Sequence, residues 1–512
     1  MATSAPHVTY GQRSLRDRLL RGMRRMGIVS PGASPQTAPP LRVRPGAAPL
    51  GKLALSHLRC TSARLQRPVD VASLAAFRVG FGALLLVVAV RYFAHGWIAE
   101  YFLNPRHFFK YWGFAWVRPW PGLGMYLHLG LMATCGLGVM LGYRYRLSLA
   151  CYALLFAYAS LIDKSHYLNH YYLVLCVCGL MAWMPLGGAW SLDARRDAGA
   201  RRAFVPTWML WALRAQFALV YFFGGVAKLN GDWLLRAQPL SVWLARSQEL
   251  PLVGRVLAAP AAAFAMSWAG ALFDLFVVPL LLARRTRPFA FAALVLFHLL
   301  TARLFPIGLF PYFMLCGASL FFPADWPRKV LERWGYGGRA GETAGPGPST
   351  GAWKWALSAY FAVQLLVPLR HWLYPGQMCW SEQGFRYSWN VMLMEKNGSV
   401  DFRVVEPSTG RVFQVSPREY FTAYQTDMMS PQPDMVLEAA RVIAADFRAR
   451  GVQEPAVYAD AFAALNGRPM QRLIDPRVDL AREVDGLSNK TWILPMTPSP
   501  EPRIASLPWS PR

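Results

Sequence analysis

Long apolar runs follow one another through most of the chain and are separated by short polar connections. Each run approaches the roughly 20 predominantly apolar residues that an α-helix needs to cross the hydrocarbon core of a bilayer. The pattern therefore predicts an all-α polytopic membrane protein with about nine transmembrane helices. The expected spans are residues 72–93, 122–143, 146–163, 168–187, 205–229, 258–283, 287–304, 306–323 and 352–371.

The pattern changes after the ninth run. Residues 385–416 alternate apolar and polar side chains, with turn signals at 396–398 (Lys-Asn-Gly) and 408–410 (Ser-Thr-Gly). This is typical of a small antiparallel sheet of about three strands. We expect these strands to belong to a small α+β extramembrane domain over residues 374–512. Amphipathic helices are predicted there by the spacing of apolar residues over residues 419–426, 434–450 and 457–466.

The segment before the first span has a different character. Residues 1–70 are basic and rich in Pro, Ala, Ser and Gly, which predicts a largely disordered cytoplasmic tail. The transmembrane domain is then expected over residues 71–373. The composition agrees with a membrane protein, because 16% of the residues are charged, against about 25% in an average soluble domain.

The basic residues favour one orientation in the membrane. The net charge is +26, but outside the tail the Lys and Arg residues gather in alternate short connections. That distribution is typical of cytoplasmic loops and of contact with anionic lipid, and it gives no support to a nucleic-acid partner. We expect a cytoplasmic N-terminus and an outer C-terminal domain, in a bacterial inner membrane or, in a eukaryotic cell, the ER membrane. The basic connections are residues 144–146, 195–202, 284–287 and 328–339.

The cysteines and the absence of familiar motifs exclude several function classes. The seven cysteines form no CxxC pair, and five of them lie inside apolar runs, so neither a metal cluster nor a disulfide framework is expected. The sequence contains no HExxH, Walker A or GxSxG motif and no Rossmann fingerprint after a strand. We therefore expect no metal site and no hydrolase, nucleotide-driven or dinucleotide-dependent activity.

Ionisable side chains within or at the edge of the spans are the candidates for chemistry, because charge is costly in hydrocarbon. Lys228 follows Gly224–Gly225, a small pair that lets another backbone come close. Burial there would favour a neutral amine, which can take a proton. His170, His298 and His371 are further candidates. Structural roles would explain these residues as well. Lys228 could simply reach water from the end of its helix, His298 could be a hydrogen-bonded core histidine, and His170 and His371 could belong to interfacial segments.

Seven sequence blocks, in the same order over about residues 70–495, resemble those of the vitamin K-dependent γ-glutamyl carboxylases. The blocks are long and cover most of the chain. They are ASLAAFRVGFG (72–82), GVMLGYRYRLS (138–148), LIDKSHYLNHYYL (161–173), VYFFGGVAKLNGDW (220–233), LFPIGLFPYFML (304–315), RYSWNVM (386–392) and DPRVDL (475–480).

The resemblance implies an enzyme that couples epoxidation of vitamin K hydroquinone by O2 to addition of CO2 at the γ-carbon of protein glutamate. In that family a lysine deprotonates the hydroquinone, O2 adds, and a vitamin K alkoxide removes the weakly acidic γ-proton. Such a strong base survives only where water is excluded, which a site among membrane helices provides. The implied cofactor is the phylloquinone or menaquinone form of vitamin K, with O2 and CO2 as co-substrates and no metal.

The resemblance also assigns roles residue by residue. Lys228 matches the base. Asn169 and His170 match a catalytic pair in which the Asn orients the amine and the His stabilises the oxygenated intermediate. Tyr221 and His298 match positions that bind the cofactor. The expected substrate-binding residues are His371, Tyr387 and Trp389.

Two departures from the family pattern leave alternatives open. Ala227 stands where vertebrate members have a second lysine, and the expected C-terminal helices contain no cysteine for a family disulfide. We therefore expect an enzyme with both carboxylase and epoxidase activity. The alternatives are a vitamin K epoxidase that lacks carboxylation and a non-catalytic quinone-binding protein or transporter. The expected partners are a glutamate-containing protein or peptide, membrane lipid and quinone, and a quinone reductase.

Overall fold

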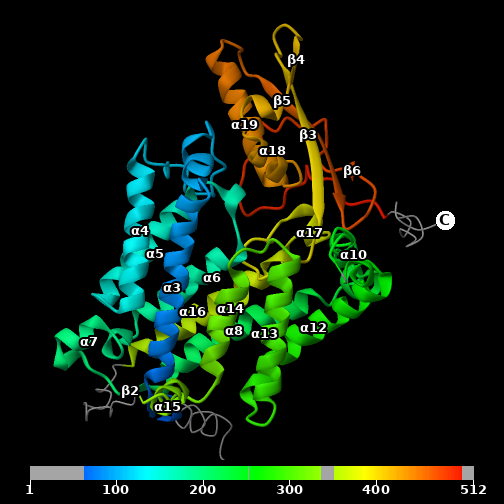
Figure 1. The fold of residues 1–512 in the computed structure, drawn as a ribbon. Helices are drawn as coiled ribbons and strands as arrows, with labels where there is room; N and C mark the ends of the chain where they lie inside the picture. The colour runs from blue at the N-terminus through cyan, green and yellow to red at the C-terminus, as the bar shows by residue number, and fades with distance from the viewer. Residues whose placement is uncertain (1–62, 252, 336–350, 499–512) are drawn as a thin grey trace, which may run out of the picture. The chain divides into compact units, whose positions relative to one another are not determined.

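Most of the apolar runs fold as long helices that lie below a small sheet in Figure 1. The computed structural model describes residues 63–251, 253–335 and 351–498. Within those ranges, six helices are long and apolar enough to cross a membrane. They are α3 (Ala72–Ala94), α4 (Gly124–Leu141), α5 (Tyr145–Ile162), α8 (Thr207–Ala227), α12 (Pro260–Leu282) and α13 (Arg287–Leu304).

The other three expected spans are helical as well, but they differ from these six. The helix α6 (Asn169–Ala182) has 14 residues, and α14 (Phe310–Ala318) continues only to Phe321 through a 3₁₀ turn. The helix α16 (Ala352–Leu369) has 18 residues and is not among the six. A mostly helical, polytopic fold is therefore confirmed, whereas the count of nine spans stays a prediction. The expected tail over residues 1–70 lies, up to residue 62, outside the described residues.

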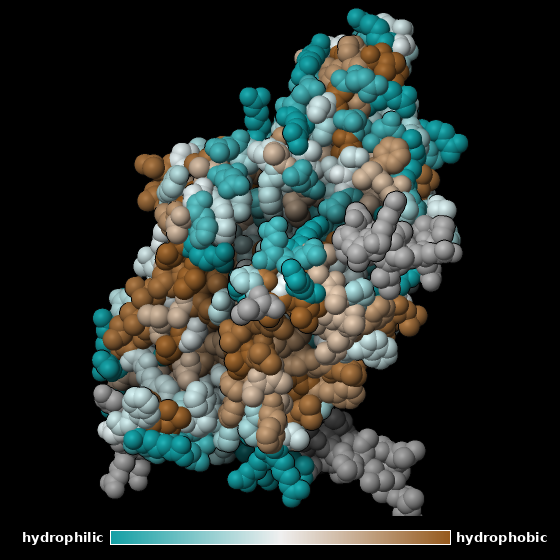
Figure 2. Space-filling view, turned by 45° about the vertical axis from the view of Figure 1, so that its right-hand side comes forward, coloured by the Kyte–Doolittle hydropathy of each residue, from teal (hydrophilic) through white to brown (hydrophobic). Residues whose placement is uncertain are grey.

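The outer surface of the helices is apolar. Figure 2 shows hydrophobic residues gathered over the helical part of the molecule, between polar surfaces above and below. Leu127 of α4, Leu154 of α5 and Leu296 of α13 are 73%, 72% and 68% exposed. A soluble monomer rarely exposes so continuous an apolar surface, whereas lipid chains would cover it without cost.

A buried arginine stabilises the end of the helical part that lies opposite the sheet. The guanidinium of Arg78, in α3, donates hydrogen bonds of 2.7 Å to the carbonyl oxygens of Val139 and Met140. Both carbonyls belong to the last turn of α4, where the regular helical hydrogen bonds end. The Val139 oxygen also accepts a 3.2 Å hydrogen bond from the N–H of Gly142, so Arg78 reinforces the cap at this helix end. The same end carries the antiparallel pair β1 (Pro68–Asp70) and β2 (Phe204–Pro206).

The C-terminal region is a four-stranded antiparallel sheet covered by helices, as far as the described residues show. The strand order is β4-β3-β5-β6. The helix α19 (Pro433–Ala449) packs on β3 and β5, and the residues between them, such as Phe402, Ile443 and Ala461, are fully buried. The strands are β3 (Lys396–Val405), β4 (Val412–Val415), β5 (Ala456–Leu465) and β6 (Gln471–Arg472).

Three predictions for this region are wrong. Residues 385–416 contain two strands rather than about three, and the other two strands of the sheet, β5 and β6, lie further along the chain. Residues 457–466, expected as a helix, form most of strand β5, because their alternate residues pack against α19 while the backbone pairs with β3. Residues 396–398, expected as a turn, begin β3. A Cβ at Gly398 would lie 2.8 Å from the nitrogen of Pro431, so this glycine permits a close approach of the chain before α19. The predicted helix over 434–450 is confirmed by α19.

Short elements connect these parts. Around the site they include α9 (Gly231–Arg236), α10 (Leu240–Ala245) and α17 (Met378–Ser381). The others are η1 (Ala99–Leu103), η2 (Lys164–His166), η3 (Leu186–Gly188), α7 (Leu192–Arg196), η4 (Ala198–Ala200), α11 (Gly254–Leu257), η5 (Ser319–Phe321), α15 (Trp326–Arg333), η6 (Arg370–Leu373), η7 (Pro417–Glu419) and α18 (Ala423–Met429).

Candidate functional site

Lys228 lies directly after the last residue of α8, where that helix meets α12. The two helices approach closely at Gly225, since a Cβ there would lie 2.9 Å from the side chain of Leu275 and 3.0 Å from its backbone nitrogen. Only a glycine leaves room for that contact. The prediction that the small pair before Lys228 admits another backbone is confirmed at Gly225.

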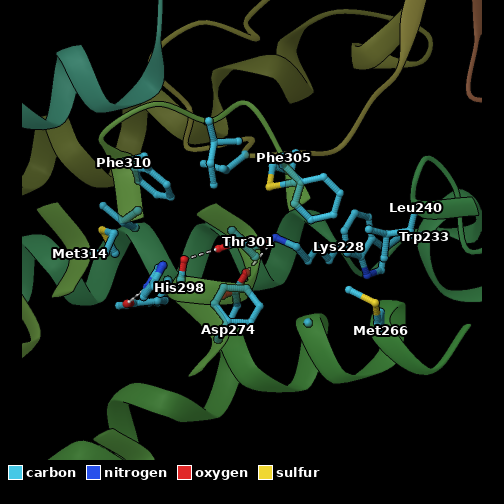
Figure 3. Close-up of a pocket in the computed structure, with 18 residues that line it drawn as sticks. Lys228, Trp233, Leu240, Met266, Asp274, His298, Thr301, Phe305, Phe310 and Met314 are labelled. Carbon is cyan, nitrogen blue, oxygen red and sulfur yellow. Dashed lines mark hydrogen bonds and ion pairs between the residues drawn. The ribbon is translucent and has the colours of Figure 1, made fainter. Parts of the chain in front are cut away.

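The amine of Lys228 is paired with a carboxylate of α12. Lys228 Nζ lies 2.8 Å from Asp274 Oδ2 and 3.2 Å from the carbonyl oxygen of Gly224 (Figure 3). The ring of Trp233, from α9, lies 5.1 Å from the same nitrogen. Lys228 is 5% exposed and Asp274 is 8% exposed, so the charges are held away from water. Such a buried pair is costly to break, because either partner alone would be an uncompensated charge.

Sequence reasoning missed Asp274. An acidic side chain in the middle of an apolar run is the same signal that singled out Lys228, and α12 carries one in the stretch Gly270–Val277. Trp233 was also missed. A tryptophan near the end of a span is common enough at membrane interfaces that its sequence position alone gives no functional signal.

A second polar pair faces the same cavity. Tyr221 lies seven residues before Lys228 on α8 and therefore on the same helix face. Its hydroxyl lies 2.7 Å from Nε2 of His298 on α13. The Thr301 hydroxyl donates to the His298 carbonyl oxygen at 3.1 Å. His298 Nδ1 is buried and has no hydrogen-bond partner within the described part of the chain. It is therefore a polar atom that a ligand could satisfy.

The rest of the cavity wall is apolar and rich in aromatic rings. An apolar pocket with a few convergent polar groups is the usual form of a small-molecule site. Besides the residues already named, the wall contains Val220, Leu240, Met266, Gly270, Phe297, Phe305, Ile307, Phe310, Met314, Val391 and Met392.

Asn169 connects the chain before α6 to the segment 387–392. It is the first residue of α6, and its carbonyl oxygen Oδ1 accepts a 3.0 Å hydrogen bond from the Tyr167 hydroxyl. Its Nδ2 donates to the carbonyl oxygen of Asn390 at 3.3 Å. The Tyr167 hydroxyl also accepts a 2.7 Å hydrogen bond from the backbone N–H of Tyr387. Asn169 therefore holds the segment that continues into the Lys228 cavity at Val391.

The segment 387–392 has an unusual backbone. Tyr387, Trp389 and Met392 have φ values of 64°, 57° and 57°, which non-glycine residues seldom adopt and which cluster at functional sites. The Trp389 ring is fully buried and stacks on Tyr172 of α6 at 5.0 Å between ring centroids. The Tyr387 ring packs edge-on against Tyr172, also at 5.0 Å. Aromatic packing of this kind stabilises the strained segment.

His170 lies beside a phenylalanine that lines the Lys228 cavity. The Phe310 ring, which lines the cavity, lies 6.3 Å from the His170 ring and 6.4 Å from the His298 ring between centroids. The His170 ring also lies against Gly308, since a Cβ there would be 3.6 Å from His170 Cε1. Both histidines therefore contact the same aromatic side chain.

His371 lines a second cavity. Its Nδ1 lies 2.7 Å from the carbonyl oxygen of Pro368 at the end of α16. Ala227 and Leu229, the neighbours of Lys228 in sequence, belong to the wall of this second cavity. The two cavities therefore lie on opposite sides of the end of α8. The polar residues of the second wall are Asn230, Asp232, His371, Gln377, Ser388, Asn390 and Asn466.

Comparison with protein families gives two matches. The HTTM domain matches residues 66–326, which is just over half of the chain. The lumenal domain of the vitamin K-dependent gamma-carboxylase matches residues 350–499.

The chain belongs to the vitamin K-dependent γ-glutamyl carboxylase family.

Membership of the carboxylase family indicates the broad function of the chain. The family implies the use of vitamin K, O2 and CO2 and action on glutamate-containing proteins. Within the described residues no group of three or more His, Cys, Asp or Glu side chains could hold a metal ion. No solved structure matches the chain.

The carboxylase lumenal domain is tied to the helical part by buried charges. The Lys164 amine, just before α6, lies 3.1 Å from Asp434 and 3.0 Å from Glu438, both on α19. The Arg386 guanidinium lies 2.6 Å from Asp434. Burial alone would raise the pKa of the Asp434 carboxyl, but Arg386 and Lys164 outweigh it and hold that pKa well below its usual range. Asp434 is therefore ionised and joins two segments that carry site residues.

A second tie lies closer to Lys228. Asp232, on α9, accepts hydrogen bonds from the Arg468 guanidinium and, at 3.0 Å, from the amide of Asn466. Burial would raise the pKa of Asp232, but its bonds to Arg468 and Asn466 lower it. The next residue, Trp233, is the one that packs against the Lys228 amine.

Seven of the eight residues predicted for the carboxylase site fall into three neighbouring groups, and the eighth, His170, lies beside Phe310 of the first cavity. Lys228, Tyr221 and His298 share the first cavity. Asn169, Tyr387 and Trp389 belong to the aromatic cluster beside it, and His371 belongs to the second cavity. In this structure the hydrogen bonds of the Lys228 amine go to Asp274 and Gly224, and those of Asn169 go to Tyr167 and Asn390. The roles assigned to these side chains stay predictions.

Proposed function

We propose that this protein couples epoxidation of vitamin K hydroquinone by O2 to CO2 addition at the γ-carbon of protein glutamate. Lys228 serves as the base toward the hydroquinone, and Tyr221 and His298 bind it. The observation that carries the proposal is the largely apolar cavity whose wall contains both the Lys228 amine and the Tyr221–His298 pair. A strong base formed in that cavity would be sheltered from protonation by water.

The adjacent cavity supports a site for the glutamyl substrate. Lys228 lines one cavity, whereas Ala227 and Leu229 line the other. The segment 388–393 is likewise shared, because Val391 faces the first cavity and Asn390 the second. We place the glutamate-containing peptide in the second cavity, near His371, with Tyr387 and Trp389 shaping the wall between the two. The reduced quinone would reach the first cavity through the lipid, and a quinone reductase would supply it.

The test uses purified protein in lipid nanodiscs. Reduced vitamin K, O2, labelled bicarbonate and a glutamate-containing peptide are supplied, and the epoxide and the labelled γ-carboxyglutamate are measured in the same sample. We expect both products from the wild type. For Lys228→Ala we expect both to fall by about 100-fold or more, the usual contribution of a general base.

The control variant is Lys329→Ala. Lys329 lies on α15, in an exposed ion pair with Asp325, and we expect wild-type yields of both products. Epoxide without carboxylated peptide would leave a vitamin K epoxidase that lacks carboxylation. If wild type and Lys228→Ala alike gave no product, the enzyme proposal would be wrong, and a quinone-binding or transport role would remain.

A further inference from the structure

The cavity holds one acid–base pair with no net charge. Among the described residues that line it, Lys228 is the single cation and Asp274 the single anion. Their side chains come from different helices and meet at 2.8 Å, with both residues more than nine-tenths buried. In Figure 3 the two side chains point toward each other across the cavity wall, beside His298 and Thr301.

This pairing bears on the role given to Lys228. An ammonium group has three N–H donors and no lone pair, so it cannot accept a proton. In the 2.8 Å ion pair of Lys228 with Asp274, the amine is the cationic partner and the carboxylate is the anionic one. The basic atom of the pair is therefore a carboxylate oxygen.

We infer that Asp274 is the final acceptor of the hydroquinone proton and that Lys228 passes the proton to it. This inference rests on the proposed function. Asp274 acts through Lys228 as a positioning and proton-accepting residue, and the Lys228 amine is the group that touches the hydroquinone.

The proton transfer balances without another reactant. Lys228 Nζ gives one of its protons to Asp274 Oδ2 and takes the proton of the hydroquinone O–H. The O–H bond breaks, its electron pair stays on the hydroquinone oxygen, and an O–H bond forms on Asp274. No group is oxidised or reduced.

The charge balance of the site favours this proton transfer. Before the step the pair is neutral, as is the hydroquinone. After it, an ammonium lies next to the hydroquinone anion, and Asp274 is a neutral acid. The site keeps zero net charge throughout, so the buried cavity never holds an uncompensated charge, which would be costly at low dielectric.

The alternative is a purely structural ion pair. In that case Asp274→Asn would leave an amine that loses its proton in the apolar cavity and then takes the hydroquinone proton by itself. Ionisation of the hydroquinone would survive the substitution. The two cases therefore predict opposite results for the same variant.

The first experiment is spectroscopic and needs no turnover. Vitamin K hydroquinone is bound under anaerobic conditions to wild type, Asp274→Asn and Asp274→Glu, and the ultraviolet absorption of the ionised hydroquinone is recorded. We expect the anion in wild type and in Asp274→Glu, and the un-ionised hydroquinone in Asp274→Asn. Infrared difference spectra of the wild-type complex should also show the carbonyl band of a protonated carboxylic acid. An anion without that band in the wild type would overturn the inference.

The second experiment measures epoxide formation. For Asp274→Asn we expect a loss of about 100-fold or more with vitamin K hydroquinone. The loss should be much smaller with a substituted hydroquinone that is already ionised at the assay pH. Asp70→Asn is the matched control, because it breaks an ion pair with Arg328 at the opposite end of the helices. It should keep the wild-type rate.

The outcomes separate the two proposals. An equal loss of activity with both hydroquinones, or no loss, would show that Asp274 accepts no proton and would overturn the inference alone. Wild type that gives no epoxide with either hydroquinone would overturn the proposed function. The anaerobic spectra would still decide whether Asp274 takes a proton.

Discussion

At the scale of single residues, buried charges are the costliest side chains in this molecule, and those at the site and in the C-terminal domain have partners. Lys228 pairs with Asp274, and Lys396 pairs with Glu382 at 2.9 Å while both are almost fully buried. Asp434 has two cationic partners at once. Removing one member of such a set leaves the others buried without compensation, which destabilises a protein far more than loss of an exposed ion pair.

Asp434 gives a pH-dependent prediction. Because its folded-state pKa lies below its unfolded value, its contribution to stability is present above the unfolded pKa and is lost as the pH falls toward the folded pKa. We expect Asp434→Asn to lower the melting temperature by several degrees at pH 7. The difference from wild type should shrink once the pH falls below about 3.9, the ordinary value for an aspartate. Thermal unfolding in detergent over that pH range measures it.

The control for this prediction is Asp427→Asn. Asp427 is exposed on the neighbouring helix α18, so we expect a melting temperature close to wild type at every pH. A destabilisation by Asp434→Asn that stayed constant down to pH 2.5 would contradict the electrostatic explanation. It would indicate instead that the side chain matters through packing.

The sequence identifies a site residue only when that residue is unusual at its own position in the chain. Lys228 could be found because a lysine at the end of an apolar run is anomalous by itself. Asp274 carried the same local anomaly, but its meaning depends on a helix 46 residues away in sequence. The pairing of His298 with Tyr221 was likewise invisible, because it joins α13 to α8 across 77 positions. The geometry of such a pair depends on how the helices pack against each other, and that packing cannot be inferred by reading a single sequence.

At the scale of secondary-structure elements, the contact between α8 and α12 controls the distance from Lys228 to Asp274. Gly225→Ala would place a Cβ 3.0 Å from the Leu275 backbone nitrogen, and backbone cannot move aside as a side chain can. We expect a destabilisation of about 1–3 kcal/mol, the usual effect of overpacking. Melting temperature measures the stability, and the epoxide assay measures the effect on the site.

Gly179→Ala is the matched helical control. A Cβ at Gly179 of α6 would meet no atom within 4 Å, so alanine fits there and favours the helix by up to about 1 kcal/mol. If both alanine variants lost the same stability, the close approach of α8 and α12 at Gly225 would not explain the loss.

Strand β5 illustrates where element prediction fails. Its alanines are good helix formers, and over ten residues the sequence satisfies both a helical and an alternating pattern. The structure places Ala459, Ala461 and Ala463 on one buried face, and all ten backbone positions pair with β3. The tertiary contact with α19 thus outweighs local propensity. The long apolar helices were predictable because the hydrocarbon core demands an uninterrupted run.

At the scale of the whole molecule, the described residues from Leu65 onward form one compact unit. We propose that the helical domain extends over residues 71–373 and the outer domain over residues 374–512. The arginine-rich connections and the sheet lie at opposite ends of the helices in Figure 1, which supports the proposed cytoplasmic N-terminus.

Cysteine labelling in intact cells tests this orientation. Ser408, in the turn after β3, and Arg285, between α12 and α13, are exposed. We expect Ser408→Cys to react with a membrane-impermeant maleimide added outside, and Arg285→Cys to react only after permeabilisation. The described native cysteines are buried or half-buried, so the parent protein supplies the background. The reverse labelling pattern would contradict the proposed orientation.

The position of Val391 and Met392 has a consequence for how such proteins can be recombined. These two residues line the cavity of Lys228, yet they belong to the segment that leads directly into β3. The outer domain is therefore not an interchangeable module attached to a self-sufficient catalytic unit. A chimera of two relatives joined after the last membrane helix would exchange part of the wall of the Lys228 cavity together with part of the wall of the second cavity. Functional hybrids should need a junction after residue 393, within the stretch that precedes β3.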